Sequence, residues 1–417
     1  MKTLYRSLLA PIGLLIYFLL ALPFSRKAKD IFKLRKESYN NRPDFLQGCY
    51  WIHASSGEFE YAKAVIREIK QNEPSAKIVA TYSSPSYAKS ISGFDGVDHA
   101  EPLPFDIQAP IKEFISHYQP KMLLIARTDL WPEILWQCGK NNIPRVLFSC
   151  SFPKQNKGLG LKWKSYLYNF LDYIFVIKDS DKTVLTNNFK LTHPQISVIG
   201  DTRIDQVLFR LSQSPIPKRD DSRICFLAGS TWQEDESVII PALAPLIEQN
   251  KLQLILVPHE PTKDHIKKTT KLLNDHKLTY ELYSNSNYNF ETPVLIVDKI
   301  GVLASLYPLA DLSFVGGSFK SEVHSVMESL GAGCLTCLGP YYRNNREAVD
   351  FSQMQVTPHW NMVNVVQNAQ GLRELATDVV QNDYELDDVE AQILAEVQVR
   401  QGASQKLFSE IERIQNV

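Results

Sequence analysis

The segment CYWIHASSGE (residues 49–58) is followed by an amphipathic segment from Phe59 to Gln71, and together they indicate the fold class. The first six residues form a short, mostly apolar run, which is typical of a buried strand. The Ser-Ser-Gly after this run favours a tight turn. Apolar side chains then recur at helical spacing. The two segments therefore predict a strand, a loop and a helix, which together are the first unit of a parallel α/β sheet.

The same alternation of short strands and amphipathic helices runs through most of the chain. It predicts the strands Cys49–Ala54, Ile78–Tyr82, Met122–Ala126, Arg145–Ser149 and Tyr173–Ile177 in a first half, and Ile224–Ala228, Leu252–Val257, Val294–Val297, Leu312–Val315 and Leu335–Leu338 in a second. A second predicted helix, Pro132–Lys140, has proline at a first-turn position, which helices tolerate. The sequence thus indicates two Rossmann-like halves, and the cleft between them is the default binding site.

The expected boundaries lie where the alternation stops. Residues 1–36 are an anchor with a basic flank, and residues 37–206 are the first domain. Residues 207–222 are polar and contain prolines, as linkers do. Residues 223–388 form the second domain. Residues 389–417 are predicted to form a helix that packs back on the first domain.

Composition excludes some classes of function. A length of 417 residues suits two domains, and 44% hydrophobic residues indicate a folded chain. With 45 basic and 46 acidic residues, no overall field attracts nucleic acid. The six cysteines are scattered through apolar runs. Cys334 and Cys337 have a CxxC spacing but no second pair and no nearby histidine pair, so buried thiols are predicted rather than a zinc site.

An uncharged apolar run extends from Leu8 to Phe24, and a basic cluster from Arg26 to Lys36 comes directly after it. The run is close to the length that a helix needs to cross a bilayer, about 20 residues. A cleaved signal peptide is the alternative, but the charge is heavier after the run than before it and an Ala-x-Ala site is absent. We expect a membrane anchor, either spanning or interfacial. Its basic flank would keep the remaining chain on the cytoplasmic side of the inner membrane.

Candidate catalytic chemistry lies in the first loop. Ser56, Gly57 and Glu58 come after the first strand, and ligands of open α/β sheets bind at that edge. Glu58 has two interpretations. It is an acceptable negative charge at a helix N-terminus, or it is a general base that points into the cleft. No GxGxxG motif is present, so a dinucleotide fingerprint is not predicted.

The second half contains two comparable loops. Ser230 and Thr231 join a strand to a helix and offer hydroxyl groups to a phosphate. Gly317 and Ser318 end a strand where backbone N–H groups can approach a ligand. His324 and Glu328 are four residues apart and are predicted to share a helix face. This pair is half of a zinc site, but a carboxylate that accepts hydrogen bonds from a ribose diol is the better chemical interpretation.

Taken in order, the motifs resemble the 3-deoxy-D-manno-octulosonic acid (Kdo) transferases of lipopolysaccharide synthesis. The resemblance covers nearly the whole chain, including its N-terminal anchor. It rests on WIHASSGE (51–58), LPFD (103–106), DLWP (129–132), GDTRID (200–205), LAGST (227–231), ILVPHEP (255–261), DxxGxLxxLY (298–307), FVGGS (314–318) and LGP (338–340).

The resemblance implies the GT-B fold, which has two Rossmann-like domains facing across a cleft. It also implies an inverting transfer of Kdo from CMP-Kdo to a lipid A precursor, with no metal or cofactor. Glu58 would be the base, and Ser56, Gly57 and Asp129 would lie at the acceptor. The residues implied at the donor are Ser230, Thr231, Pro258, His259, Gly301, Leu303, Gly317, Ser318, His324, Glu328 and Asn344.

The chain departs from the family pattern at a few positions. His259 stands where many relatives have arginine, and Ser325 stands where an asparagine is usual after the histidine. Arg127 replaces an acid, and residues 320–323 replace glycines. These departures bear on the affinity for the donor and on the choice of acceptor.

Two other functions stay open at this point, because fold alone does not select a function. One is a GT-B transferase that uses a UDP-sugar and another lipid acceptor. The other is a non-catalytic protein that binds sugar nucleotides or lipids. Glu58 and Glu328 argue against the second of these, and the ordered set of motifs favours Kdo transfer over the first.

Overall fold

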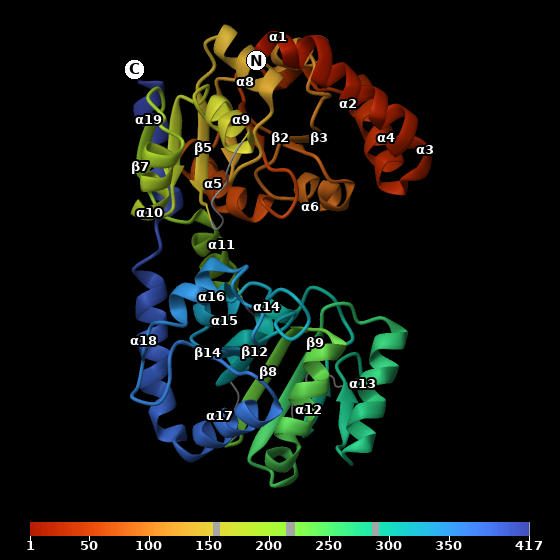
Figure 1. Ribbon diagram of the computed structural model, residues 1–417, viewed down its shortest axis with the longest axis vertical. Coiled ribbons are helices and arrows are strands. Elements are labelled where there is room, and N and C mark those ends of the chain that lie inside the picture. The colour runs from red at the N-terminus through yellow and green to blue at the C-terminus, as the bar shows by residue number, and fades with distance from the viewer. Residues whose placement is uncertain (153–158, 214–221, 286–291, 417) are drawn as a thin grey trace. The chain divides into compact units, whose positions relative to one another are not determined.

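The computed structural model describes residues 1–152, 159–213, 222–285 and 292–416. The chain divides into two compact units. Unit 1 comprises Met1–Gln206 and Gln401–Val417, and unit 2 comprises Val207–Arg400. Both units alternate strands and helices, and the colours of Figure 1 trace the chain from one unit into the other and back again at its end.

Within the described residues, unit 1 contains one seven-stranded sheet in the order β3-β2-β1-β4-β5-β6-β7, and all of its pairings are parallel. Its strands are β1 (Tyr50–His53), β2 (Ile78–Tyr82), β3 (His99–Pro102), β4 (Met122–Ala126), β5 (Arg145–Cys150), β6 (Tyr173–Val176) and β7 (Gln195–Val198). The central strands are buried on both faces, which is why they read as continuous apolar runs.

The helices of unit 1 cover both faces of this sheet. They are α4 (Arg26–Asn40), η3 (Asp44–Leu46), α5 (Phe59–Asn72), η4 (Pro85–Tyr87), α6 (Ala88–Ser92), α7 (Gln108–Tyr118), α8 (Pro132–Lys140), α9 (Leu159–Tyr168), α10 (Asp179–Thr183), η5 (Val184–Asn188) and α19 (Ala403–Gln415). Alternate side chains of β1 enter different cores. Ile52 packs in the core shared with α5 and α19, and Trp51 packs in the core shared with α7 and α8.

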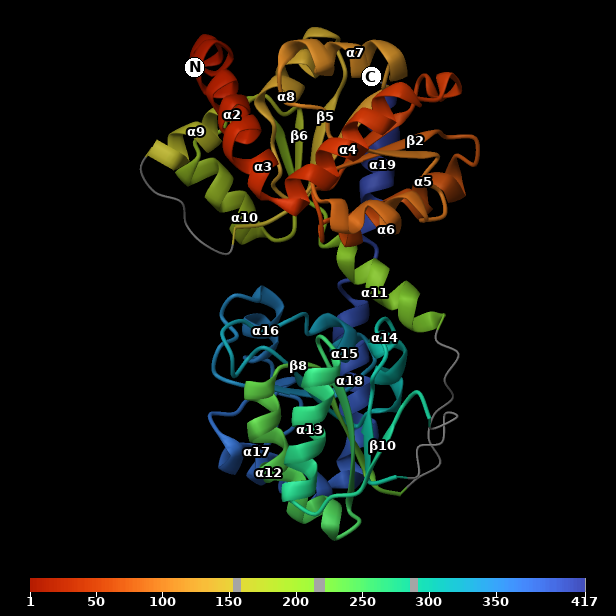
Figure 2. The same cartoon turned by 90° about the vertical axis from the view of Figure 1, so that its right-hand side faces the viewer.

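The N-terminal run is a continuous helix, Lys2–Phe24, made of α1 (Lys2–Leu4), η1 (Tyr5–Leu9), α2 (Ala10–Ile16), η2 (Tyr17–Ala21) and α3 (Leu22–Phe24). It has 23 residues, and its apolar stretch is not buried, so by length and composition it can cross a membrane. Ser25 ends it and caps α4 by accepting a hydrogen bond from the N–H of Ala28. The chain turns at this point and α4 runs back along unit 1 (Figure 2).

Unit 2 repeats the design. Its described residues form a seven-stranded parallel sheet in the order β10-β11-β9-β8-β12-β13-β14. The strands are β8 (Ile224–Thr231), β9 (Leu252–Pro258), β10 (Tyr280–Leu282), β11 (Val294–Ile296), β12 (Leu312–Val315), β13 (Leu335–Leu338) and β14 (Val363–Val365). The helices are α12 (Gln233–Glu248), α13 (Lys263–Asp275), α14 (Leu303–Leu306), η6 (Tyr307–Leu309), α15 (Met327–Gly331), α16 (Arg346–Phe351), α17 (Ala369–Gln381), η7 (Asp383–Glu385) and α18 (Leu386–Gln398).

Two expectations about the connections need correction. The predicted linker starts at residue 207, but α11 (Thr202–Ser212) continues through that point because its apolar side chains keep helical spacing. Residues 214–221 of the predicted linker lie outside the described residues. The final segment is two helices rather than one. It breaks at Gly402, whose φ of 91° is left-handed, so α18 packs in unit 2 and α19 packs on α5 in unit 1.

The break at Gly402 is held by a buried carboxylate. Asp205 accepts hydrogen bonds from the backbone N–H groups of Gly402 and Ser404 and from the Ser404 hydroxyl, each at 2.7 Å. These N–H groups belong to the start of α19, where a helix leaves its donors unpaired. Asp205 therefore fastens the returning C-terminal segment to unit 1.

We predict that Asp205→Ala lowers the free energy of unfolding of unit 1 by about 2–3 kcal/mol, because a buried N–H loses a charged acceptor. Denaturant unfolding followed by tryptophan fluorescence measures the loss. The matched variant Ser404→Ala removes only the hydroxyl donor and should cost about 1 kcal/mol. Equal costs in the two variants would contradict the role of Asp205 as a cap.

Candidate functional site

The strand order of unit 1 reverses between β1 and β4, which are adjacent in the sheet but not consecutive in the chain. At such a point the crossover connections diverge and leave a crevice at the carboxyl edge of the sheet. The loop after β1 carries Ser56, Gly57 and Glu58, and the loop after β4 carries Asp129. The topology thus brings the loops that carry the predicted base Glu58 and the three predicted acceptor residues, Ser56, Gly57 and Asp129, to one switch point.

Glu58 is held by its own loop. Its Oε2 accepts hydrogen bonds from the Ser55 hydroxyl, the Ser56 hydroxyl and the Ser56 N–H, each at 3.1 Å. Among the described residues, the Glu58 side chain makes no capping hydrogen bond to the first turn of α5. Within the part of the chain that the structure describes, Oε1 accepts no hydrogen bond. The carboxylate is therefore oriented by the loop rather than used as a helix cap, and one oxygen is available to take a proton.

Asp129 continues a buried polar chain. Its Oδ2 lies 2.9 Å from His53 Nε2, and His53 Nδ1 lies 3.0 Å from the Thr81 hydroxyl. Burial alone would raise the pKa of Asp129, but the hydrogen bond and charge of His53 outweigh it, so the pKa is lower than usual. His53 is buried within the first strand, and it also orients Asp129.

Arg127 shapes the same loop. Its φ of 68° is left-handed, a conformation that non-glycine residues rarely adopt. Its guanidinium donates to the Ser151 hydroxyl and lies 4.9 Å from the centroid of the Tyr61 ring. Arg127 stands where the family pattern has an acid. It therefore puts a cation two residues before Asp129 in the same loop.

Unit 2 has its own switch point, between β8 and β12. Ser230 lies at a bulge at the end of β8 with a φ of 54°. Gly316, at the end of β12, approaches the backbone of Ser230 so closely that a Cβ would overlap it. The Thr231 hydroxyl is buried and donates to Glu236 at 2.9 Å. Any contact between Thr231 and a sugar-nucleotide donor would therefore come from the Thr231 backbone.

A buried carboxylate occupies the N–H groups of the Gly-Gly-Ser loop. Asp235 Oδ2 accepts from the N–H of Gly317 at 2.7 Å, and Oδ1 accepts from the N–H of Phe319 at 2.9 Å. Burial raises the pKa of Asp235 above its ordinary value, although these N–H groups oppose the rise. The expectation that the Gly317 N–H group faces a ligand therefore needs correction, since an internal acceptor holds it.

Three rings form a stack beside this loop. The His259 and His324 rings are parallel, with centroids 4.4 Å apart, and the Trp232 ring lies 4.9 Å from that of His259. The Trp232 indole N–H donates to His324 Nε2 at 3.2 Å, and the Lys320 ammonium lies 3.2 Å from the Trp232 centroid. Burial, followed by the charges of His259 and Lys320, lowers the pKa of His324 to about 4.

Several other residues that were predicted to bind the sugar-nucleotide donor lie in the loops of unit 2, and two of them stabilise these loops by hydrogen bonds. The Ser318 hydroxyl donates to the Val315 carbonyl and accepts from the Gly339 N–H. The Asn344 amide pairs with both backbone groups of Val323. Pro258 ends β9, Gly301 forms a turn with a φ of 91°, and Leu303 begins α14. They lie in the loops at the carboxyl edge of the unit 2 sheet.

The predicted helix face shared by His324 and Glu328 is wrong. The helix α15 begins only at Met327. His324 precedes it in a loop, and the His324 N–H donates to the Gly316 carbonyl. The Asn345 side chain also holds the His324 carbonyl, which keeps this segment out of the helix. Glu328 instead pairs with Arg210 at 2.7 Å. Among the described residues no cluster suited to a metal ion occurs.

The CxxC cysteines are buried, and burial raises the pKa of both the Cys334 and the Cys337 thiols.

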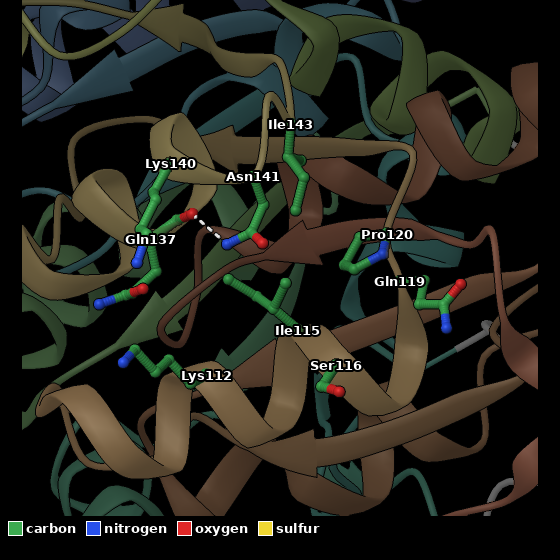
Figure 3. A pocket seen from close by; sticks show the side chains of 9 residues that line it. All are labelled: Lys112, Ile115, Ser116, Gln119, Pro120, Gln137, Lys140, Asn141 and Ile143. Carbon is green, nitrogen blue, oxygen red and sulfur yellow. Dashed lines mark hydrogen bonds between the residues drawn. The ribbon is translucent and has the colours of Figure 1, made fainter.

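A cavity of about 510 Å³ lies between α7 and α8, at the amino ends of β4 and β5. Figure 3 shows Lys112 and Lys140 beside it, with the Asn141 amide bonded to the Gln137 carbonyl. This cavity is at the edge of the sheet opposite to Glu58, so it is not part of the candidate site.

Comparison with known proteins agrees with this geometry. Residues 27–206 match the family model described as 3-Deoxy-D-manno-octulosonic-acid transferase (kdotransferase). The 3-deoxy-D-manno-octulosonic acid transferase of Haemophilus influenzae is 27% identical over 295 residues, 68% of each chain. That of Rickettsia bellii is 25% identical over 363 residues, 82% of each chain. Residues 27–206 thus match the Kdo transferase family, and the similarity to curated Kdo transferases extends over up to 82% of the chain.

Kdo transferases are glycosyltransferases of lipopolysaccharide biosynthesis, so the chain is an enzyme of that class. A glycosyltransferase structure from Rickettsia africae shares the GT-B-like fold. Its TM-score is 0.56 at 13% identity, over 89% of this chain and 99% of that one. The fold class expected from the sequence is therefore confirmed as two parallel α/β sheets with an N-terminal apolar helix.

Trp232 and Asp235 were not singled out from the sequence, and Lys320 was noted only within the segment 320–323 that replaces the family's glycines. The acidic run Glu234–Glu236 directly after a strand and its loop was a usable signal, because acids in the first turn of a helix often hold a neighbouring loop. Trp232 and Lys320 are far apart in the chain and meet only when β8 and β12 lie side by side.

We predict that His324 is neutral at pH 7 and titrates near pH 4. Its folded-state pKa lies below the unfolded value of 6.5, so the unfolded chain takes this proton first. The contribution of His324 to stability is then complete above pH 6.5 and is lost as the pH falls toward 4. NMR titration of histidine-labelled protein, assigned with His324→Gln, measures the midpoint. A midpoint near 6.5 would contradict the stacked arrangement.

Proposed function

We propose that the protein transfers Kdo from CMP-Kdo to a lipid A precursor with Glu58 as the general base. The observation that carries the proposal is the Glu58 carboxylate at the switch point of unit 1 in a member of this family. Three hydrogen bonds fix Oε2, and Oε1 is left to accept a proton. A general base needs this combination of a fixed position and an available oxygen.

The proposed step is a single displacement. A hydroxyl of the acceptor sugar loses its proton to Glu58 as its oxygen forms a bond to the anomeric carbon of Kdo. The bond from that carbon to the phosphate oxygen of CMP-Kdo breaks, and CMP leaves with the electron pair. Attack from the face opposite CMP inverts the anomeric centre. Asp129, oriented by His53, is proposed to position the acceptor.

We propose that unit 2 holds CMP-Kdo at the β8–β12 switch point. His259, His324 and Trp232 form a ring surface there, and Lys320 adds a positive charge beside it. The departing CMP is then stabilised by this charge and by fixed loop dipoles. Because Asp235 already uses the N–H groups of Gly317 and Phe319, Lys320 is the group we assign to the phosphate.

Attachment to the membrane is a consequence of the same acceptor. A lipid acceptor stays in the bilayer, so its enzyme must work at the bilayer surface. The helix Lys2–Phe24 exposes its apolar side chains, and Arg26, Lys27, Lys29, Lys33 and Lys36 are exposed on α4. Arg35 is the exception in the basic cluster, since it donates to the Leu103 carbonyl. We propose that both units lie on the cytoplasmic face, where anionic lipids attract the exposed cations.

We predict that Glu58→Gln lowers kcat for Kdo transfer by about 10²–10⁴-fold, the usual contribution of a general base. The assay combines purified protein, CMP-Kdo and a tetra-acylated lipid A precursor, and calorimetry checks that CMP still binds. The matched control is Glu60→Gln, an acid in the first turn of the same helix that pairs with Lys63. Full activity in Glu58→Gln would refute the base assignment.

The same assay separates the remaining functions. Turnover with a UDP-sugar but not with CMP-Kdo would identify a UDP-sugar as the donor. Binding of a sugar nucleotide or lipid without turnover of any donor would show that the protein is a non-catalytic binding protein. Transfer that requires CMP-Kdo supports the proposal.

We predict that both units are digested by protease in inside-out membrane vesicles and are protected in intact spheroplasts. The reason is that the basic flank of the apolar helix holds the chain on the cytoplasmic side. Immunoblotting with a C-terminal tag reads the result. Digestion in spheroplasts would place the units on the opposite face.

A further inference from the structure

A cavity of about 410 Å³ separates the N-terminal helix from the sheet of unit 1. The helix contributes Leu9, Gly13 and Leu14 to one wall, and the loop after β3 contributes Leu103 and Phe105 to the other. The lining is mainly apolar, and the volume falls within the range of ligand pockets, roughly 300–1,000 Å³. The space is thus suited to an apolar group rather than to a charged one.

The cavity is built between polar attachments. The Tyr5 hydroxyl donates to Asp106 at 2.6 Å, and Arg6 makes a two-pronged ion pair with buried Glu133 at 2.8 and 2.7 Å. On the other side Arg35 donates to the Leu103 carbonyl at 2.8 Å and lies 4.3 Å from the Phe105 centroid. These contacts fix both walls, so the space between them is a feature of the fold.

The outer side of the helix continues the apolar surface. Its exposed large hydrophobic side chains are Leu4, Leu8, Leu9, Ile12, Leu15, Ile16, Phe18, Leu19, Leu20 and Phe24. Such a surface is stable only against lipid or another apolar partner. Leu9 belongs both to this surface and to the lining of the cavity. The cavity therefore adjoins the face of the helix that would contact the bilayer.

The inner side of the cavity reaches the candidate catalytic loop. Ser83, which lines it, donates its N–H to the Ser55 carbonyl at 3.1 Å, and the Ser55 hydroxyl holds Glu58. Trp131, also in the lining, is two residues from Asp129. The Ser83 hydroxyl is buried and, among the residues that the structure describes, has no hydrogen-bond partner. A buried hydroxyl without a partner suits the carbonyl oxygen of a ligand.

We propose that this cavity holds one acyl chain of the lipid acceptor, with the acyl carbonyl near the Ser83 hydroxyl. The proposal rests on the proposed function and specifies how the acceptor is held. The chain would enter from the bilayer beside the N-terminal helix. Its sugar would then lie at the loop that carries Glu58. An acyl chain is selected because the lining is apolar, adjoins the exposed face of the helix and leads to the catalytic loop.

Gly13 gives a direct test. It lines the cavity, and a Cβ added there meets no atom within 4 Å, so a side chain can start at this position without overlapping protein atoms. Gly13→Leu is expected to raise KM for a long-chain acceptor by at least about tenfold, the effect of excluding two methylene groups. Its kcat/KM for a short-chain analogue should stay within about twofold of that of the unsubstituted protein. The matched control is Leu15→Phe, which enlarges an exposed side chain of the same helix outside the cavity.

A readout without turnover accompanies the kinetics. An acceptor analogue with a photoreactive group on its acyl chain is expected to cross-link to residues 9–14 and 103–107. Gly13→Leu should lose this cross-link, and Leu15→Phe should keep it. Cross-linking elsewhere, or equal labelling by a phospholipid that carries the same chain, overturns the proposal. A cross-link in this cavity together with no use of CMP-Kdo would leave the acyl site standing and reject the proposed donor.

Discussion

Strand β1 lies beside β4, and β8 lies beside β12, and this strand order controls where ligands can reach each unit. In each sheet the chain moves outward from its first strand in one direction and then in the other, so two neighbouring loops have no helix packed between them. Glu58 and Asp129 meet at one such place. Ser230 and Gly317 lie at the other. The strand order therefore brings the candidate residues of each unit to one edge of its sheet.

Buried carboxylates fix several connections between elements within each unit. Asp235 joins the loop after β12 to the start of α12, Asp205 joins α11 to α19, and Glu133 joins α8 to the N-terminal helix through Arg6. A buried carboxylate is unfavourable unless it is fully hydrogen-bonded. Each of these acids accepts at least two hydrogen bonds, so each connection has a definite geometry. This arrangement limits the freedom of loops that would otherwise be mobile.

The N-terminal helix is attached to unit 1 by polar contacts as well as being apolar on its exposed face. Its polar attachments to Asp106 and Glu133 hold it along unit 1, and its apolar face is left exposed. Burial raises the pKa of Asp106 to about 6, although the hydrogen bonds from Tyr5 and from the Glu133 and Ile134 N–H groups oppose the rise. In the proposed reaction, the lipid acceptor and the loop that carries Glu58 would then share one surface of unit 1.

The parallel α/β character, the central strands and the loops that carry Glu58 and Gly317 could all be predicted from the sequence. Four of the ten predicted strands, such as Met122–Ala126, match their bounds in full, because burial on both faces requires a continuous apolar run. The strands β3, β7, β10 and β14 were missed. They include the edge strands of both sheets, where partial exposure admits polar residues and weakens the pattern.

Only the packed fold shows which polar groups of the candidate sites already have hydrogen-bond or ion-pair partners within the protein. The fold pairs the Gly317 N–H with Asp235, the Thr231 hydroxyl with Glu236, and Arg6 with Glu133, which is 127 residues away. It also starts α15 after His324, since contacts with Gly316 and Asn345 hold that segment in a loop. Local patterns reflect neighbours along the chain and the alternation of buried faces. Hydrogen bonds between distant segments depend on how those segments pack, so no local pattern contains them.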